Sequence, residues 1–170
     1  QYDSKAGFLN LFTNDEKNGI LTSTITTNKA DMDGEGTDTF SCKVFLPRYD
    51  EVISTGWGFY TTDDSRKAYL TTQAYNSTTS SSKPHVIGDA WTWWTRSVPS
   101  VGASSVTRID SNGSYYSDDA CVGYHGIRPV INLDPTIKIS DTTDSDECYY
   151  AIWNNAPSVP ASITVPSEVK

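Results

Sequence analysis

The chain has 170 residues and a formal net charge of −8, with 21 acidic residues against 13 lysines and arginines. This length suits one domain with a substantial core. The acidic balance argues against nucleic acid and anionic membrane as partners, because like charges repel. No apolar run reaches the length of a membrane span or a signal-peptide core, so membrane insertion is not expected.

The first third of the chain predicts short elements. Residues 14–17 read as a cap and a short helix, and residues 22–27 as a strand. The acidic segment 31–39 lacks the spacing of an EF-hand, since its glycine comes fourth and no glutamate follows at the twelfth position. A solvated turn is therefore favoured there over a calcium site. Residues 42–46 predict a buried strand, and residues 49–53 predict one helical turn.

The middle of the chain combines an irregular region with a tryptophan-rich strand. Residues 56–88 predict long loops, and the polar stretch 76–83 predicts a mobile surface loop that could act as a lid. Residues 90–97 predict one strand, in which alternation puts Trp91 and Trp93 on one face and Trp94 on the other. One face can then anchor a core while the other offers flat indole surface to a ligand.

The last third predicts a hairpin and a closing strand. Residues 106–109 and 114–117 are expected to pair across the turn Asp110-Ser111-Asn112-Gly113. Further predicted features are a break at 118–120, a resumed strand at 121–124, a buried strand at 127–133 and another strand at 149–153.

Short strands and two small helices together predict an α+β fold. Residues 1–154 are expected to form one domain. Residues 155–170, with three prolines and no periodicity, predict a linker or the start of a following module in a larger multimodular chain. The three cysteines, Cys42, Cys121 and Cys148, allow at most one intrachain disulfide and contain no CxxC pair, so no metal or other cofactor is expected.

Four motifs carry a resemblance to a known family: Lys43-Val44-Phe45-Leu46, Trp93-Trp94-Thr95-Arg96-Ser97, Gly113 and Gly126-Ile127-Arg128-Pro129-Val130. Over residues 8–133 the chain resembles a family of bacterial surface domains of unassigned function. Two positions depart from the commoner pattern: Pro47 stands where a serine is usual, and Trp91 adds an aromatic residue.

The resemblance implies a C-type-lectin-like fold, similar to the scaffold of formylglycine-generating enzymes and of receptor-binding proteins diversified by retroelements. It also implies a secreted or cell-surface location in Gram-positive gut bacteria. Starch-adherence proteins of amylosome-type assemblies carry domains of this kind.

The predicted site is an aromatic platform with polar groups around it. Aromatic rings offer stacking area for a sugar, whereas carboxylate and imidazole groups bond to its hydroxyls. The predicted ligand-binding residues are Trp91, Trp93, Tyr115, Tyr116, Asp118, Asp119, Tyr124 and His125. The alternative interpretation, which stays open for Trp93, assigns the family motif residues Trp94, Arg96 and Arg128 to the core and to a buried guanidinium network.

These features predict a monomeric, non-catalytic carbohydrate-binding module for starch or malto-oligosaccharides. One alternative is a protein-binding adhesin or retroelement-diversified receptor domain, since residues 111–125 are rich in Tyr and Ser. The other is a glycoside hydrolase that uses the acidic groups at 63–64, 118–119 or 144–147. With only His85 and His125 in the chain and no nucleophile elbow, Ser-His-Asp catalysis is less favoured.

Overall fold

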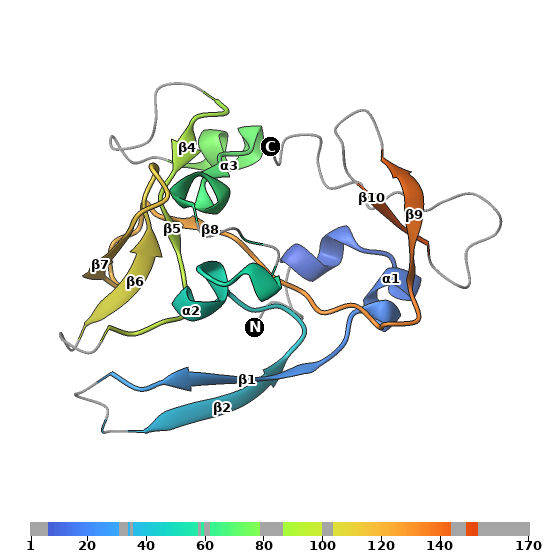
Figure 1. Ribbon diagram of the computed structural model, residues 1–170, viewed down its shortest axis with the longest axis horizontal. Helices are drawn as coiled ribbons and strands as arrows, with labels where there is room; N and C mark the ends of the chain where they lie inside the picture. The colour runs from blue at the N-terminus through green and yellow to red at the C-terminus, as the bar shows by residue number, and fades with distance from the viewer. Residues whose placement is uncertain are drawn as a thin grey trace. The chain divides into compact units, whose positions relative to one another are not determined.

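The computed structural model describes residues 7–30, 34, 36–57, 59, 62–78, 87–99, 104–143 and 149–152 (Figure 1). This described part is mixed α+β, with short strands in four small sheets and three short α-helices, which confirms the predicted class. None of its helices is long and apolar enough to cross a membrane. Residue contacts divide it into two compact units, each described by itself below. The segment 155–170, predicted to be a linker, lies outside the described residues.

The first unit comprises the described residues within 1–23, 41–44 and 131–167. A 3₁₀ turn (Phe8–Leu11) leads into α1 (Asn14–Gly19), which confirms the predicted helix. Thr13 caps α1 through a capping box: the Glu16 backbone N–H donates to the Thr13 hydroxyl at 3.3 Å, and the Thr13 N–H donates to the Glu16 carboxylate at 2.7 Å. The core of this unit consists of Leu9, Phe12, Ile20 and Val44, with Phe8, Ile131 and Leu133 packed against it.

The C-terminal part of the first unit is an antiparallel pair, β9 (Lys138–Thr143) and β10 (Tyr149–Ile152), so the strand predicted at 149–153 is confirmed. The predicted strand 127–133 is wrong. Val130 and Leu133 form only isolated bridges, to Phe45 and Ile20 respectively. Pro129 explains the interruption, because proline has no backbone N–H to donate to a ladder.

The second unit comprises the described residues within 24–40, 45–130 and 168–170. Its four-stranded sheet has the order β7-β6-β5-β8 (Figure 1), formed by β5 (Trp93–Trp94), β6 (Ser105–Ile109), β7 (Tyr115–Asp119) and β8 (Gly126–Ile127). Strand β6 is antiparallel to β5 and β7, and β5 is parallel to β8. The predicted hairpin is confirmed, but β7 continues through Asp119 instead of breaking at 118, and residues 121–124 form turns, not a strand.

One face of this sheet carries the core of the second unit. Trp93 and Ile109 are register partners on β5 and β6, and Val52 of α2 (Tyr49–Val52) packs against both. All three side chains are almost fully buried, with exposed fractions of 2% or less. The helix α2, predicted as one turn, therefore covers this face, which we call the core face.

Glu51 ties α2 to the segment after β5. Its carboxylate accepts from the Arg96 Nη1 at 2.8 Å and from the Arg96 Nη2 at 2.5 Å, and it accepts from the Arg48 backbone N–H at 2.7 Å. Arg96 Nη1 also donates to the Leu46 carbonyl at 2.5 Å. Because both charged side chains are mostly buried, each compensates the desolvation of the other.

The predicted continuous strand 90–97 is interrupted at Thr92. Upstream of it, β4 (Ala90–Trp91) pairs with β3 (Ala68–Tyr69), whereas β5 belongs to the four-stranded sheet. The region predicted to be irregular also holds 3₁₀ turns at Thr55–Trp57 and Asp63–Arg66 and a helix, α3 (Thr72–Ser77). Residues 79–83 of the predicted mobile loop, 76–83, lie outside the described residues.

A two-stranded sheet precedes these elements, formed by β1 (Ser23–Asn28) and β2 (Thr37–Cys42). The strand predicted at 22–27 is confirmed. The strand predicted at 42–46 is wrong, since β2 ends at Cys42 and only Phe45 makes a single bridge. Of the predicted acidic turn, residues 31–33 and 35 lie outside the described residues, and Thr37 already belongs to β2.

Candidate functional site

The face of the sheet opposite the core face carries a row of large side chains. The register pairs Tyr116 with Arg108, Arg108 with Trp94, and Trp94 with Ile127. Register partners on adjacent strands point to the same face, so these four side chains form one line across the sheet, which we call the cross-sheet row. Tyr116 and Ile127, at its two ends, are about half exposed, at 51% and 54%.

Arg108 is held in place beneath Tyr116. Its guanidinium carbon lies 5.4 Å from the centre of the Tyr116 ring, within the range of a cation–π contact. Two carboxylates lie within ion-pair distance of the guanidinium: Asp110 is 3.1 Å from Nη1 and Asp118 is 3.3 Å from Nε. In the row, the Arg108 cation therefore lies against the Tyr116 ring and beside two carboxylates.

His125 lies beside this row and is buried. Its Nε2 is 3.1 Å from the Asp118 carboxylate and its Nδ1 is 2.5 Å from the Thr92 hydroxyl. The imidazole centre lies 4.4 Å from the Trp94 ring in an edge-to-face arrangement, and 4.5 Å from the Tyr124 ring. His125 thus connects Trp94 to Asp118, and Asp118 in turn orients Arg108.

Burial lowers the pKa of His125, and the nearby Arg108 cation acts in the same direction, while the hydrogen bond to Asp118 opposes them. The neutral imidazole is thus favoured at neutral pH. Its Nε2–H donates to the carboxylate, which can only accept, and Nδ1 accepts from the Thr92 hydroxyl. For Asp118, burial acts to raise the pKa, but the bonds from His125 and the Asp119 backbone and the charge of Arg108 lower it overall. Asp118 is therefore an anion.

This arrangement predicts acid sensitivity near the pKa of histidine. Because the folded-state pKa of His125 lies below its ordinary value of 6.5, the unfolded chain binds the proton first. The stabilisation is complete above pH 6.5 and is lost as the pH falls through the window below it. Urea unfolding at a series of pH values should show wild-type stability falling more steeply between pH 7 and 5 than that of His125→Gln. Parallel curves would contradict the assignment.

The hydrogen-bonded side chains of Thr92, His125 and Asp118 follow the hydroxyl–imidazole–carboxylate order of a catalytic triad. A nucleophile must, however, reach the substrate. Thr92 is only 8% exposed, and the His125 side chain is 1% exposed. Thr92 and His125 are buried, whereas 28% of the Asp118 side chain is exposed. The two hydrogen bonds join Thr92, in the tryptophan segment, to strand β7, and we call this arrangement the His125 clamp.

The structure brings together four of the eight predicted site residues: Tyr116, Asp118, Tyr124 and His125. Trp93 is a core residue on the opposite face, so its predicted role in an exposed platform is wrong. The cause is the interruption at Thr92, which ends the alternation assumed for a continuous strand.

The other three predicted residues lie outside this group of four. Trp91 is half-buried in β4, and its indole N–H donates to the Tyr124 carbonyl at 2.8 Å. Tyr115 lies on the core-face side, where its ring centre is 4.4 Å from that of Tyr49, although 54% of it is exposed. Asp119 is exposed and accepts from the Ser104 hydroxyl at 3.0 Å.

Three residues of the row were missed by the sequence interpretation: Arg108, Trp94 and Ile127. A signal for Arg108 was present: counting outward from the turn at Asp110–Gly113 places it opposite Tyr116. Trp94 was assigned to the core, but it lies on the face opposite the core, and Trp93 is the core residue. The two faces were assigned the wrong way round because β5 begins only at Trp93.

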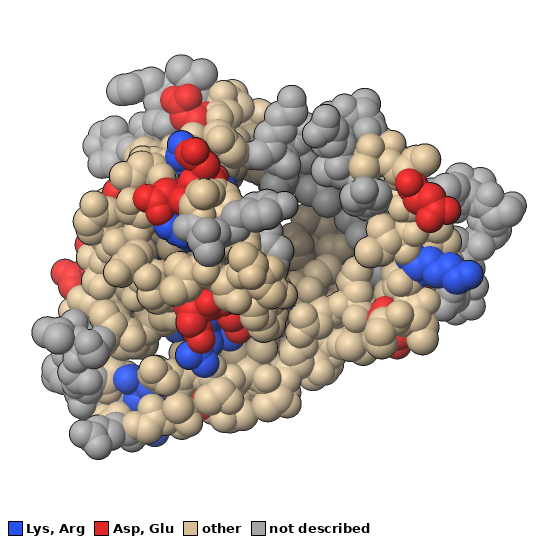
Figure 2. Space-filling model, in the orientation of Figure 1, with Lys and Arg blue, Asp and Glu red and all other residues tan. Residues whose placement is uncertain are grey.

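Charge and metal-binding groups add two constraints. On the face shown in Figure 2, Lys and Arg side chains are scattered and lie beside acidic ones, without a broad basic surface. Within the described residues, no group of three or more His, Cys, Asp and Glu side chains could hold a metal ion. Cys148 lies outside these residues, and so do Asp144, Asp146 and Glu147.

Comparison with known proteins assigns the family. The family model described as a domain of unknown function (DUF6273) matches residues 4–135, which is more than half of the chain. Searches of curated proteins and of solved structures found no match. The extent of this match includes the cross-sheet row and the His125 clamp. The chain therefore belongs to the family of the domain of unknown function DUF6273.

Proposed function

We propose that the domain is a non-catalytic carbohydrate-binding module that binds starch or malto-oligosaccharides through the cross-sheet row. The proposal includes a C-type-lectin-like scaffold and a secreted or cell-surface location in a gut bacterium. The observation that carries it is the half-exposed Tyr116 ring, braced on one face by Arg108 and flanked by the fixed Asp118 carboxylate. A stacking surface with an oriented donor and acceptor beside it is what a sugar ring needs.

The spacing of the row favours an extended, neutral ligand. Tyr116 and Trp94 are two strands apart, about 10 Å at the usual spacing of strands. Consecutive sugar units could therefore lie along the row, over Tyr116 and toward Trp94. Two carboxylates, Asp110 and Asp118, outweigh the single Arg108 cation, so the surface favours hydroxyl groups over an additional anion.

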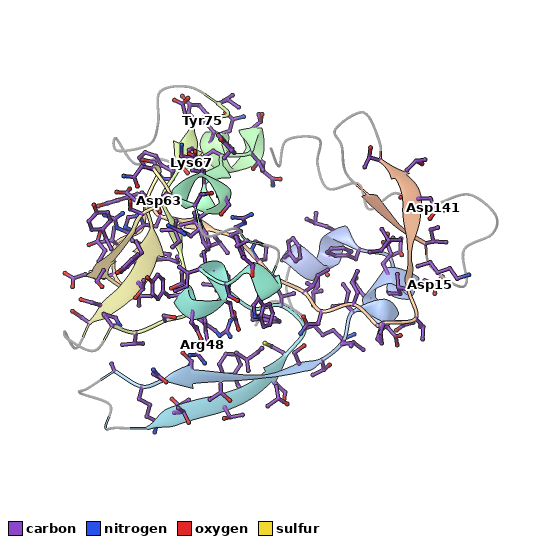
Figure 3. The ribbon with its side chains drawn as sticks, in the orientation of Figure 1. Asp15, Arg48, Asp63, Lys67, Tyr75 and Asp141 are labelled. Carbon is purple, nitrogen blue, oxygen red and sulfur yellow. The ribbon has the colours of Figure 1, made fainter. Side chains whose placement is uncertain are left out.

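Of the other acids predicted for a hydrolase, the two that the structure describes, Asp63 and Asp64, are in local ion pairs. Asp63 pairs with Arg66, and the Asp64 carboxylate lies 2.6 Å from the Lys67 ammonium; Asp63 and Lys67 are labelled in Figure 3. Such i,i+3 pairs stabilise the turn that contains them. These contacts support a binding role over hydrolysis.

We expect Tyr116→Ala to weaken the affinity for maltoheptaose about tenfold, which corresponds to the loss of about 1.4 kcal/mol of stacking. The matched control is Tyr115→Ala, which removes an equally exposed tyrosine from the next position on the opposite face and should change affinity less than about twofold. Isothermal titration measures both, with cellulose-type and mannan-type oligosaccharides as additional ligands.

The alternative outcomes separate the candidates. Loss of binding in Tyr115→Ala alone would place the site on the other face. Binding of a β-linked oligosaccharide instead of maltoheptaose would support the cross-sheet row as the binding site but would show that the proposed ligand is wrong. Absence of heat with every sugar would favour the second candidate, a protein-binding adhesin or retroelement-diversified receptor domain. That candidate is supported by the exposed Tyr115, Tyr116 and Ile127 side chains, since tyrosine-rich surfaces bind proteins well.

A further inference from the structure

The Arg128 guanidinium lies within cation–π distance of two aromatic rings. Its guanidinium carbon is 5.0 Å from the centre of the Phe59 ring and 5.2 Å from the Trp93 ring. Trp93 belongs to the core of the second unit, and Phe59 packs against the same core. Arg128 directly follows Ile127 of β8, and its contact with Trp93 puts it on the core-face side of the sheet, away from the cross-sheet row.

Arg128 differs from every other arginine of the chain in having no carboxylate partner among the described residues. Arg48 pairs with Asp50, Arg66 with Asp63, Arg96 with Glu51, and Arg108 with both Asp110 and Asp118. The Arg128 Nη1 is buried without a hydrogen-bond acceptor among the described residues. Buried nitrogens of Arg96 and Arg108 also have none, but those two guanidinium groups have carboxylates beside them. A buried charged donor without an acceptor is unfavourable, so this group is suited to receive one from outside the described chain.

The geometry of a stacked guanidinium determines what it can bind. The N–H donors of a guanidinium lie in the plane of the group, where a carboxylate can bond to two of them at once. The side chain is half-buried, and this burial lowers the pKa of Arg128. The ordinary pKa of arginine is so high that the group remains a cation at neutral pH. The contacts with Phe59 and Trp93 restrict the movement of the guanidinium before the acceptor arrives.

We propose that Arg128, in contact with the Phe59 and Trp93 rings, binds the carboxylate group of a small ligand. One cation balances one negative charge, so a carboxylate monoanion is favoured over a dianionic phosphate, which would bring excess negative charge to a chain of net charge −8. The site is independent of the proposed glycan site, because Trp93 and Trp94 face opposite sides of the sheet.

The test uses the full 170-residue chain labelled with ¹⁵N. Sodium acetate and then sodium glucuronate are added while NMR follows the Arg128 Nε–H and Trp93 Nε1–H signals, with sodium chloride at equal ionic strength as the reference. We expect a saturable shift of both signals with each carboxylate, a smaller one with sodium phosphate, and none with chloride. A response to glucuronate alone would restrict the proposal to acidic sugars, whereas equal responses would assign it to the carboxylate itself.

Variants make the assignment specific. Arg128→Met should weaken the apparent affinity for acetate, read from the Trp93 signal, at least tenfold. The matched control, Arg48→Met, removes an arginine that pairs with Asp50 at the start of α2 and should leave the affinity unchanged (Figure 3). Tyr116→Ala should also leave it unchanged, so failure of the glycan site and failure of this site are distinguishable.

Two results would overturn the proposal. One is a wild-type chain whose Arg128 signal responds to neither acetate nor glucuronate more than to chloride; this reading needs no variant and therefore holds even if Arg128→Met does not fold. The other is a folded Arg128→Met chain, with wild-type circular dichroism, that keeps the saturable response.

Discussion

Trp93→Ala is expected to lower the free energy of unfolding by about 3–5 kcal/mol, at the upper end of what single core substitutions cost. Trp93 is 2% exposed and fills the space between Val52 and Ile109. Its indole N–H also donates to the Arg66 carbonyl at 3.0 Å, so the substitution leaves a cavity and an unsatisfied buried carbonyl together. Urea unfolding followed by circular dichroism measures the loss.

The neighbouring Trp94 supplies the control for this prediction. Its side chain is half-buried on the opposite face and packs edge-to-face with His125. Trp94→Ala should therefore cost about 1–2 kcal/mol, clearly less than Trp93→Ala. Equal losses in the two variants would show that the two faces of β5 are not divided between core and surface in this way.

Gly113→Ala is expected to destabilise the domain by about 3 kcal/mol, for two separate reasons. Gly113 ends the turn between β6 and β7 with φ of 86°, where a residue with a Cβ costs about 1–2 kcal/mol. A Cβ there would also lie 1.8 Å from the backbone oxygen of Asp63, so one of the two segments must move. That movement would disturb the bond from the Arg66 Nε to the Gly113 carbonyl, 2.8 Å long.

The substitution Gly88→Ala separates the conformational cost of a positive φ from the clash with Asp63. Gly88 has nearly the same conformation, with φ of 91°, but no heavy atom lies within 4 Å of the position its Cβ would occupy. Gly88→Ala should therefore show only the conformational cost, about 1 kcal/mol. Thermal unfolding of both variants compares them directly, and an equal loss in each would exclude the close approach of Asp63 to the turn.

Local chemistry predicted the elements that depend on neighbouring residues. The capping pair Thr13 and Glu16 marks the start of α1, and the Asp110–Gly113 turn sets the register of the β6–β7 hairpin within a few residues. Each of these elements is specified by side chains three or four positions apart. They were predictable because no distant segment is needed to form them.

The interruption of the tryptophan segment depends on distant partners and could not be predicted. Trp91 pairs with Ala68, whereas Trp93 pairs with Ile109 and Gly126. Nothing in the sequence from 90 to 97 shows that its two halves join different sheets. The same limit applies to the predicted site. The site residues of the hairpin and of the turn after it were predicted from local sequence. The faces of Trp93 and Trp94 were assigned the wrong way round, because the start of β5 decides which side of the sheet each one points to.

The discontinuous composition of the first unit has a consequence for synthesis on the ribosome. Its described residues come from three separate stretches, within 1–23, 41–44 and 131–167. The core residues Leu9, Phe12 and Ile20 therefore leave the ribosome long before Ile131 and Leu133, which complete their packing. The core of the second unit, made of Val52, Trp93 and Ile109, is complete earlier in translation. During that interval the apolar N-terminal segment must stay unpaired, a period in which exposed hydrophobic chain is prone to aggregation.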